Sequence, residues 1–376
     1  MRIAVICGSL AKGKDGVGDY SRRLVSAIGS GHQILLLSLR DIEKKQEQLG
    51  NVQVQRFRNP LYRADAASRA LGTIREFQPD VISLQFVPFA FSSKGVIREL
   101  ISLIDELADL CPIHIMFHEL WLGEKPSLPL KHKILGIAQK RLILRALGHW
   151  KPALIHTSNT HYRDVLLRNG HKATILPLFG NIPIEAADPA AAESMLTHLP
   201  VSAHERIILF PFSQSHSWHS RHVMSVLKKA AQIAGVSLRL IQVGKNAYVE
   251  HHWPRIKAFA RHEGWKSYTL GPRTESELSQ LLQLADVGVS SAHLQLAGKS
   301  GAIIGMLEHG LPVICSSMEL ESRYNVPPMD SLSALYSIDQ PVEDIAELLA
   351  NPVKAKSGSR LSAVATQWID ELGALA

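Results

Sequence analysis

Short apolar runs alternate with amphipathic stretches along the chain. In the first half, runs rich in Ile, Val and Leu lie at residues 2–7, 32–37, 52–56, 81–85, 113–117, 153–157 and 173–176. Short runs of this kind predict buried strands. Residues 19–29, 66–77, 93–110 and 130–149 carry apolar side chains at helical spacing. The alternation predicts a doubly wound parallel α/β sheet.

The same alternation starts again in the second half. Strands are predicted at 206–210, 237–243, 267–271, 286–290, 311–315 and 331–338, and helices at 221–234, 253–263, 275–284, 302–309, 342–349 and 361–375. Thr274 and Glu277 have the spacing of a capping box. Residues 181–202, rich in Ala and Pro, predict either a linker or a linker with a short helix. We therefore predict Rossmann-like domains at 1–185 and 186–358, followed by a C-terminal helix within 359–376.

The amino-acid composition is that of a folded globular protein rather than a disordered one. The 376 residues are 46% hydrophobic and 20% charged, which is typical of chains with large buried cores. The net charge of +7 fits phosphorylated substrates, anionic lipid or nucleic acid. Cys7, Cys111 and Cys315 lack CxxC spacing, which predicts reduced thiols in a cytoplasmic protein. We expect no spanning helix, since no apolar run reaches roughly 18 residues. We expect no secretion signal, since Met1–Gly8 is too short for its apolar region.

Residues 290–315 form the most informative stretch of the chain. They read as a strand end, a glycine-bearing loop, a short helix, a glycine stop and another strand. Gly298, Lys299, Ser300 and Gly301 come just before the helix. Because the first N–H groups of a helix are unpaired and its dipole is positive there, this loop predicts a diphosphate site.

Two other interpretations of the loop stay open. Gly298-Lys299-Ser300 has the ending of a Walker A loop, but His293 stands where that pattern needs a glycine, and no matching magnesium-binding aspartate is evident. In the other interpretation the glycines only permit a tight turn between strand and helix.

Short motifs follow the predicted elements in a characteristic order. In the first half they are GVGDYSRRL at 16–24, PDVISLQ at 79–85, FHE at 117–119, TS at 157–158 and LPL at 176–178. In the second half they are QVG at 242–244, LG at 270–271, EL at 277–278, ADV at 285–287, EHGLPV at 308–313 and WI at 368–369. Their order over nearly the whole chain resembles the GT-B glycosyltransferases, especially the retaining group 1 family. The resemblance implies an α/β GT-B fold, in which two Rossmann-like domains face each other across a cleft and a closing tryptophan helix crosses back to the first domain.

The chain departs from this family at two places. The family has two glutamates eight residues apart before its Gly-x-Pro-Val motif, and Ala297 and Gly305 stand at those positions here. Because the first glutamate normally helps to hold the donor sugar, retention rests on the resemblance alone. The basic pair after the first strand of the second domain is also altered, and Arg221 is the best candidate to replace its phosphate-neutralising lysine.

The resemblance, with the glycine loops, assigns three groups of site residues. The donor diphosphate is expected to contact Gly16, Gly18, Arg221, Gly298, Lys299, Ser300 and Gly301. The donor nucleoside or sugar is expected to contact Gly244, Arg273 and Glu308. The catalytic candidates are His118, Glu119 and Asp19.

Each catalytic candidate also has a structural interpretation. His118 follows a strand, at the edge where such sheets bind ligands, but a lone histidine there is often structural. Glu119 either activates an acceptor or faces solvent or caps a helix. Asp19 either binds an acceptor hydroxyl or caps the helix that it opens.

Histidines recur every third residue at His216, His219 and His222, which suggests a metal site. The spacing matches neither a zinc finger nor HExxH, so we expect no metal. We expect a cationic loop instead, with Trp218 stacking on a base or sugar. The sequence calls for no cofactor besides the nucleoside-diphosphate sugar, which is a co-substrate.

The predicted helix at 130–149 has a basic face and an apolar face. It is either a core helix with a solvated basic face, or it docks on anionic lipid or a lipid-diphosphate acceptor at the inner face of a membrane. A nucleic-acid partner is not expected, because the chain is only 6% aromatic and shows no recognition module.

Together these features predict a cytoplasmic, metal-independent, retaining hexosyltransferase. It would move a sugar from a nucleoside-diphosphate sugar to an acceptor hydroxyl on a glycan or lipid-linked saccharide, as in polysaccharide biosynthesis. Two alternatives stay open: a catalytically silent protein of the same fold that binds a nucleotide or glycan, and a sugar-nucleotide epimerase.

Overall fold

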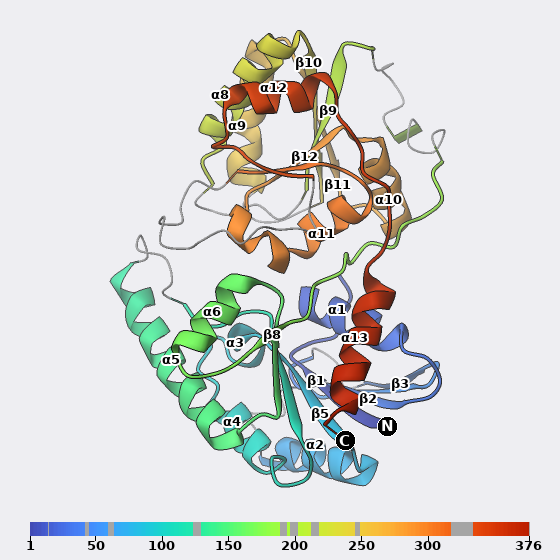
Figure 1. Ribbon diagram of the computed structural model, residues 1–376, viewed down its shortest axis with the longest axis vertical. Coiled ribbons are helices and arrows are strands. Elements are labelled where there is room, and N and C mark those ends of the chain that lie inside the picture. Colours follow the sequence, from blue (N-terminus) through green and yellow to red (C-terminus); the bar gives the residue numbers. More distant parts are fainter. Residues whose placement is uncertain are drawn as a thin grey trace. The chain divides into compact units, whose positions relative to one another are not determined.

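The computed structural model describes residues 1–13, 15–41, 45–58, 64–122, 129–188, 194–195, 202–211, 218–244, 249–316 and 334–375. The chain divides into two compact units: unit 1 is Met1–Leu178 with Leu361–Ala376, and unit 2 is Phe179–Arg360. Each unit is a mainly parallel sheet flanked by helices (Figure 1). The prediction of a doubly wound α/β architecture is confirmed in both halves.

Unit 1 contains a sheet in the order β3-β4-β2-β1-β5-β6-β7-β8. Its strands are β1 (Arg2–Cys7), β2 (Gln33–Ser38), β3 (Lys45–Leu49), β4 (Val52–Arg56), β5 (Val81–Phe86), β6 (Ile113–Phe117), β7 (Leu154–Thr157) and β8 (Thr174–Ile175). All neighbours are parallel except β3 and β4, which form an antiparallel hairpin at one edge. The sequence did not predict β3, because its residues KQEQL are mostly polar.

The helices of unit 1 are α1 (Gly16–Ser26), α2 (Ala64–Phe77), α3 (Pro88–Phe91), α4 (Arg98–Asp105), α5 (Leu130–Trp150), α6 (Thr160–Arg168) and α13 (Leu361–Gly373). Far along the chain from the others, α13 lies beside α1 (Figure 1). Two helices of unit 1 begin three or more residues from their predicted starts. The helix expected at 93–110 begins only at Arg98, because Gly95 has a left-handed φ of 63°. The helix expected at 19–29 begins at Gly16.

Unit 2 contains an all-parallel sheet in the order β11-β10-β9-β12-β13-β14. Its strands are β9 (Glu205–Phe210), β10 (Ser237–Val243), β11 (Lys266–Gly271), β12 (Val287–Ser290), β13 (Val313–Cys315) and β14 (Leu335–Ser337). Both faces are covered, so successive residues of one strand enter different cores. Ile207 and Leu209 of β9 pack in one cluster, whereas Ile208 and Phe210 pack in the other.

The helices of unit 2 are α8 (Ser220–Ala234), α9 (Val249–His262), α10 (Glu275–Leu284), the 3₁₀ helix η2 (Leu294–Lys299), α11 (Gly301–Glu308) and α12 (Val342–Ala350). The predicted capping box is present, with Thr274 and Glu277 each bonding the other's backbone N–H. Among the helices described in either unit, none is long and apolar enough to cross a membrane.

Candidate functional site

The strand order of unit 2 identifies the edge where a ligand would bind. From β9 the sheet continues to β10 and β11 on one side and to β12, β13 and β14 on the other. The direction of winding therefore reverses between β9 and β12. Open parallel sheets bind ligands at the carboxyl ends of the strands beside such a reversal. The segments that follow β9 and β12 lead to the starts of α8 and α11.

The start of α11 contains the predicted glycine-lysine-serine motif in a different local structure. Gly298 and Lys299 belong to η2 rather than to a loop, and Gly301 is the first residue of α11. Ser300 is the N-cap, and its Oγ accepts the N–H of Ile303 at 3.3 Å. The Ser300 hydroxyl is therefore used within the helix cap, whereas the positive end of the helix dipole and Lys299 are the parts suited to an anion.

Arg221 lies in the first turn of α8, where it is exposed to solvent. This places a cation in the segment after β9, the other strand at the reversal point. Trp218 does not match its prediction, because its side chain is only 5% exposed and packs in the core around Phe210. Its indole N–H donates to Ser316 Oγ at 2.7 Å, so the ring is not available to stack on a base or sugar.

The histidine series does not form a metal site within the described residues. His216 lies outside them, His219 is exposed, and His222 Nε2 is 4.0 Å from Asp339 Oδ1. No group of three or more metal-ligating side chains occurs in the part of the chain that the structure describes.

The residues expected to contact the donor nucleoside or sugar lie in two different places. Gly244 follows β10 with a left-handed φ of 85°, and its N–H donates to the Gly271 carbonyl at 2.7 Å. Arg273 follows β11, with Nη1 3.4 Å from Glu277 Oε1. Gly244 and Arg273 are thus both at the carboxyl edge of the sheet.

Glu308 is at the opposite end of α11 from Ser300, about 12 Å away along a helix of this length. Its side chain is buried, and Oε1 accepts the N–H of Arg360 at 3.0 Å. Its backbone carbonyl accepts the N–H of Gly358. These contacts hold residues 358–360 against the C-terminal end of α11.

In unit 1, the glycines after β1 form the first turn of α1. Asp15 is the N-cap, and its carboxylate accepts the N–H groups of Val17 and Gly18 at 2.9 Å. Two of the first N–H groups of α1 are therefore bonded to a carboxylate of the chain itself. A Cβ at Gly18 would overlap the carbonyl oxygen of Ser9, so close packing of the helix on its own loop explains this glycine.

Asp19 does not cap α1, since Asp15 does. Its carboxylate accepts the N–H of Gly13 at 3.1 and 3.2 Å and so closes the loop onto the helix. Glu119, next to His118, is partly exposed.

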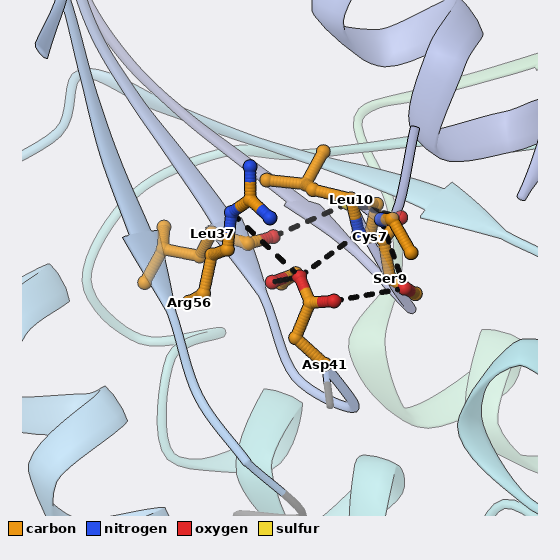
Figure 2. A network of polar contacts seen from close by, with 8 residues as sticks. Cys7, Ser9, Leu10, Leu37, Asp41 and Arg56 are labelled. Carbon is orange, nitrogen blue, oxygen red and sulfur yellow. Dashed lines mark hydrogen bonds and ion pairs between the residues drawn. The ribbon is translucent and has the colours of Figure 1, made fainter. Parts of the chain in front are cut away.

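The buried carboxylate of Asp41 holds the start of the loop between β1 and α1 (Figure 2). Asp41, only 4% exposed, follows β2 and accepts hydrogen bonds from the Leu10 N–H at 3.0 Å and from the hydroxyls of Ser9 and Ser38. Arg56 Nε is 4.0 Å from the same carboxylate. Because Asp41 carries these contacts, it is a structural anchor that the sequence did not single out.

His118 follows β6 at the carboxyl edge of the unit 1 sheet and is 8% exposed. Its Nε2 is 2.9 Å from Gln85 Oε1, and its ring packs edge-on against Tyr20 with centroids 4.8 Å apart. Burial lowers the pKa of His118 to about 3, so the imidazole is neutral at physiological pH.

The sequence missed a row of polar side chains that continues from His118 across the same sheet. Ser83 and Gln85 alternate along β5, and His114 and His156 occupy β6 and β7. All four are almost fully buried. Polar residues at every second position of otherwise apolar strands were the available signal, because buried polar groups require partners.

The basic helix α5 has two halves with different surroundings. In its second half the side chains of Ile143, Leu147 and Trp150 are buried. In its first half Leu130, Ile134 and Ile137 are 73%, 60% and 53% exposed. Lysines are exposed next to this apolar stripe, at Lys131 and Lys133.

No protein-family model matches the sequence, and neither does any curated protein. Solved structures do match the fold along the whole chain. An α,α-trehalose 6-phosphate synthase from Burkholderia multivorans matches with a TM-score of 0.58 and 11% identity, over 99% of this chain and 93% of its own. HepE from Anabaena, solved in complex with UDP-glucose, matches with a TM-score of 0.55 and 12% identity over 100% of both chains.

A UDP-GlcNAc 2-epimerase from Methanocaldococcus jannaschii matches with a TM-score of 0.55 and 10% identity, also over 100% of both chains. At identities this low the likeness concerns the fold. It confirms the predicted class, two Rossmann-like domains that account for the whole chain.

Proposed function

We propose that this chain, which has the GT-B fold, is a glycosyltransferase that takes its sugar from a nucleoside-diphosphate donor. The observation that carries the proposal is the start of α11 in unit 2. A helix N-terminus, preceded by Lys299, follows β12 at the point where the winding of the sheet reverses. Arg221 adds a second cation after the neighbouring strand β9.

These groups suit the chemistry of sugar transfer. The departing nucleoside diphosphate gains negative charge as its bond to the sugar breaks, and fixed cations and N–H dipoles stabilise that charge without a metal. His118 is proposed to contact the transferred sugar, with Glu119 beside it. We also propose that the configuration of the sugar is retained, which the family resemblance supports.

The proposed acceptor is a hydroxyl of a glycan or of a lipid-linked saccharide. The first half of α5 supports the lipid-linked case, since an exposed apolar stripe next to lysines suits the surface of an anionic membrane. In that arrangement the enzyme works at the inner face of the membrane without crossing it.

A thermal-shift screen with UDP, GDP, dTDP and ADP and their sugar conjugates, with and without EDTA, tests the donor. A ligand that binds only the native state raises Tm, by the equivalent of about 2.7 kcal/mol at a hundred times its Kd. We expect one nucleoside diphosphate to raise Tm regardless of EDTA. Lys299→Ala should weaken its binding about tenfold or more, because one charge-assisted contact to phosphate contributes roughly 1.5–3 kcal/mol.

Lys257→Ala is the matched control, because this lysine is exposed on α9 in the same unit. Equal weakening by the two substitutions would point to net charge rather than to a site at α11. Absence of a Tm shift with every nucleotide would contradict the donor proposal. Conversion of the donor sugar to its epimer without an acceptor, followed by NMR, would replace transfer by epimerisation.

A further inference from the structure

A continuous series of hydrogen bonds, buried except at its last link, connects His118 to Glu371 on α13. Its first links are His118 Nε2 to Gln85 Oε1 at 2.9 Å and Gln85 Nε2 to Ser83 Oγ at 2.9 Å. The series continues from Ser83 Oγ to His114 Nδ1 at 2.9 Å and from His114 Nε2 to His156 Nδ1 at 3.0 Å. It ends where His156 Nε2 meets Glu371 Oε2 at 2.5 Å.

The positions of the strands explain why these side chains meet. Ser83 of β5 is in register with His114 of β6, so both project from the same face of the sheet. Helix α13 packs on that face, where Trp368 lies edge-on to the His114 ring with centroids 6.4 Å apart. Glu371, one turn further along α13, is also held by Gln367, whose Nε2 donates to Glu371 Oε1 at 2.8 Å.

Each neutral imidazole and the Ser83 hydroxyl has one proton to donate, and the Gln85 amide donates only from its nitrogen end, so the end of the series sets its direction. An ionised carboxylate only accepts, and therefore His156 must donate from Nε2. A neutral His156 then accepts at Nδ1, which requires His114 to donate from Nε2. A neutral His114 in turn accepts the Ser83 hydroxyl proton at Nδ1.

The side-chain amide of Gln85 connects Ser83 to His118, so it determines which nitrogen of His118 carries the proton. Once Ser83 donates its proton to His114, Ser83 Oγ must accept from the Gln85 NH₂ group. This turns Gln85 Oε1 toward His118, and that oxygen can only accept. The proton of His118 must then be on Nε2.

Burial supports the neutral state that this reasoning needs. Desolvation lowers the pKa of His114 and of His118. It also lowers the pKa of His156, although the hydrogen bond and charge of Glu371 oppose the shift. At neutral pH each imidazole therefore carries one proton.

We propose that the carboxylate of Glu371 sets the tautomer of His118, so that Nε2 carries the proton and Nδ1 presents its lone pair. Gln85, Ser83, His114 and His156 are positioning residues in this assignment, because they act on a ligand only through His118. One consequence rests on the proposed function: His118 would accept a hydrogen bond from a sugar hydroxyl and could not donate one.

The tautomers can be measured directly in the full chain labelled with ¹⁵N-histidine. Long-range ¹H–¹⁵N correlation spectra separate the Nε2–H form, the Nδ1–H form and the imidazolium by their nitrogen shifts. We expect the neutral Nε2–H pattern for the three histidines of the series, assigned by the loss of each signal in a His→Asn variant. A neutral Nδ1–H form of His118 would overturn the proposal, because it requires the whole series to run in the reverse direction.

Glu371→Ala tests whether the carboxylate is the cause. Glu371 is partly exposed at the surface of unit 1, so the protein should fold without it. We expect His118 to lose its single tautomer and to show both forms, and Ser83→Ala, which interrupts the series, should do the same. Asp370→Ala is the control, since this neighbour on α13 is exposed. An unchanged Nε2–H pattern in Glu371→Ala and Ser83→Ala would overturn the proposal, and because no substrate is present, this outcome is independent of nucleotide binding.

Discussion

Two glycines at the start of α1 are constrained in different ways, although they belong to one sequence motif. A Cβ at Gly16 would meet no atom within 4 Å, and Gly16 is not at a left-handed φ. A Cβ at Gly18 would overlap the Ser9 backbone. At the scale of the residue, only Gly18 requires the absence of a side chain, and the reason is packing within unit 1.

Gly18→Ala should therefore lower the free energy of unfolding by roughly 1–3 kcal/mol, the usual cost of forcing atoms into a filled space. Gly16→Ala should leave it unchanged or raise it by up to about 1 kcal/mol, because alanine is the better helix former. Urea titrations followed by circular dichroism would measure both. Equal effects would mean that the Ser9 contact does not decide the identity of residue 18.

At the scale of the element, α5 combines two environments that its sequence presents as one amphipathic helix. Its second half packs into the core of unit 1, whereas its first half exposes the stripe of Leu130, Ile134 and Ile137. Each of these side chains would gain roughly 1.5–3 kcal/mol on full burial in an apolar phase. Membrane docking would bury the stripe only in part.

Ile134→Gln combined with Ile137→Gln should lower the binding of the protein to vesicles rich in phosphatidylglycerol by about tenfold or more, since each 1.4 kcal/mol lost is a factor of ten. Leu167→Gln is the control, because Leu167 is 60% exposed but lies on α6. Co-sedimentation at low and at physiological salt would measure the effect. Equal losses in both variants, or equal binding to neutral vesicles, would contradict docking through α5.

How far the sequence predicts each element depends on how local its determinants are. Strands such as β1 and β2 were predictable because their apolar residues are consecutive, and the α10 cap because its partners are three residues apart. The start of α1 was not predicted correctly, because Asp15 caps the helix and Asp19 does not. The buried polar series from Ser83 to Glu371 was not predictable from the sequence either, because its hydrogen bonds join residues that are 31, 42 and 215 positions apart.

The candidate site follows the same rule. The glycine-lysine-serine motif before α11 could be recognised in the sequence. Its local structure could not, because the 3₁₀ turn through Lys299 and the use of Ser300 as a cap depend on how that segment packs. Trp218 was expected to stack on a base or sugar because it lies in the histidine-bearing segment that was predicted to be a cationic loop. Its burial depends on Ser316, which is 98 residues further along the chain.

At the scale of the whole molecule, burying neutral histidines makes stability depend on pH. The pKa of His118 is about 3 in the folded chain and near 6.5 when unfolded. As pH falls below 6.5 the unfolded chain binds a proton that the folded chain does not, so the folded state loses stability toward acid. Between pH 7.5 and 5.5 this single group should lower the free energy of unfolding by about 1.4 kcal/mol.

Urea titrations of the wild type and of His118→Gln at these two pH values would test the effect. The variant should lose about 1.4 kcal/mol less than the wild type on acidification. His114 also has a lowered pKa, so both proteins should still be destabilised by acid. Identical losses would mean that His118 is protonated equally in the folded and unfolded chains.

Unit 1 takes its last helix from a segment that is synthesised after the whole of unit 2. At roughly 5–20 residues per second, translation of unit 2 takes on the order of 10–40 s. During this time β5, β6 and β7 have been synthesised but α13 has not. The face that receives Trp368 and Glu371 is uncovered in that interval. Unit 2, which is continuous in the chain, can complete its core first. On the ribosome, the unit that starts first would therefore finish last.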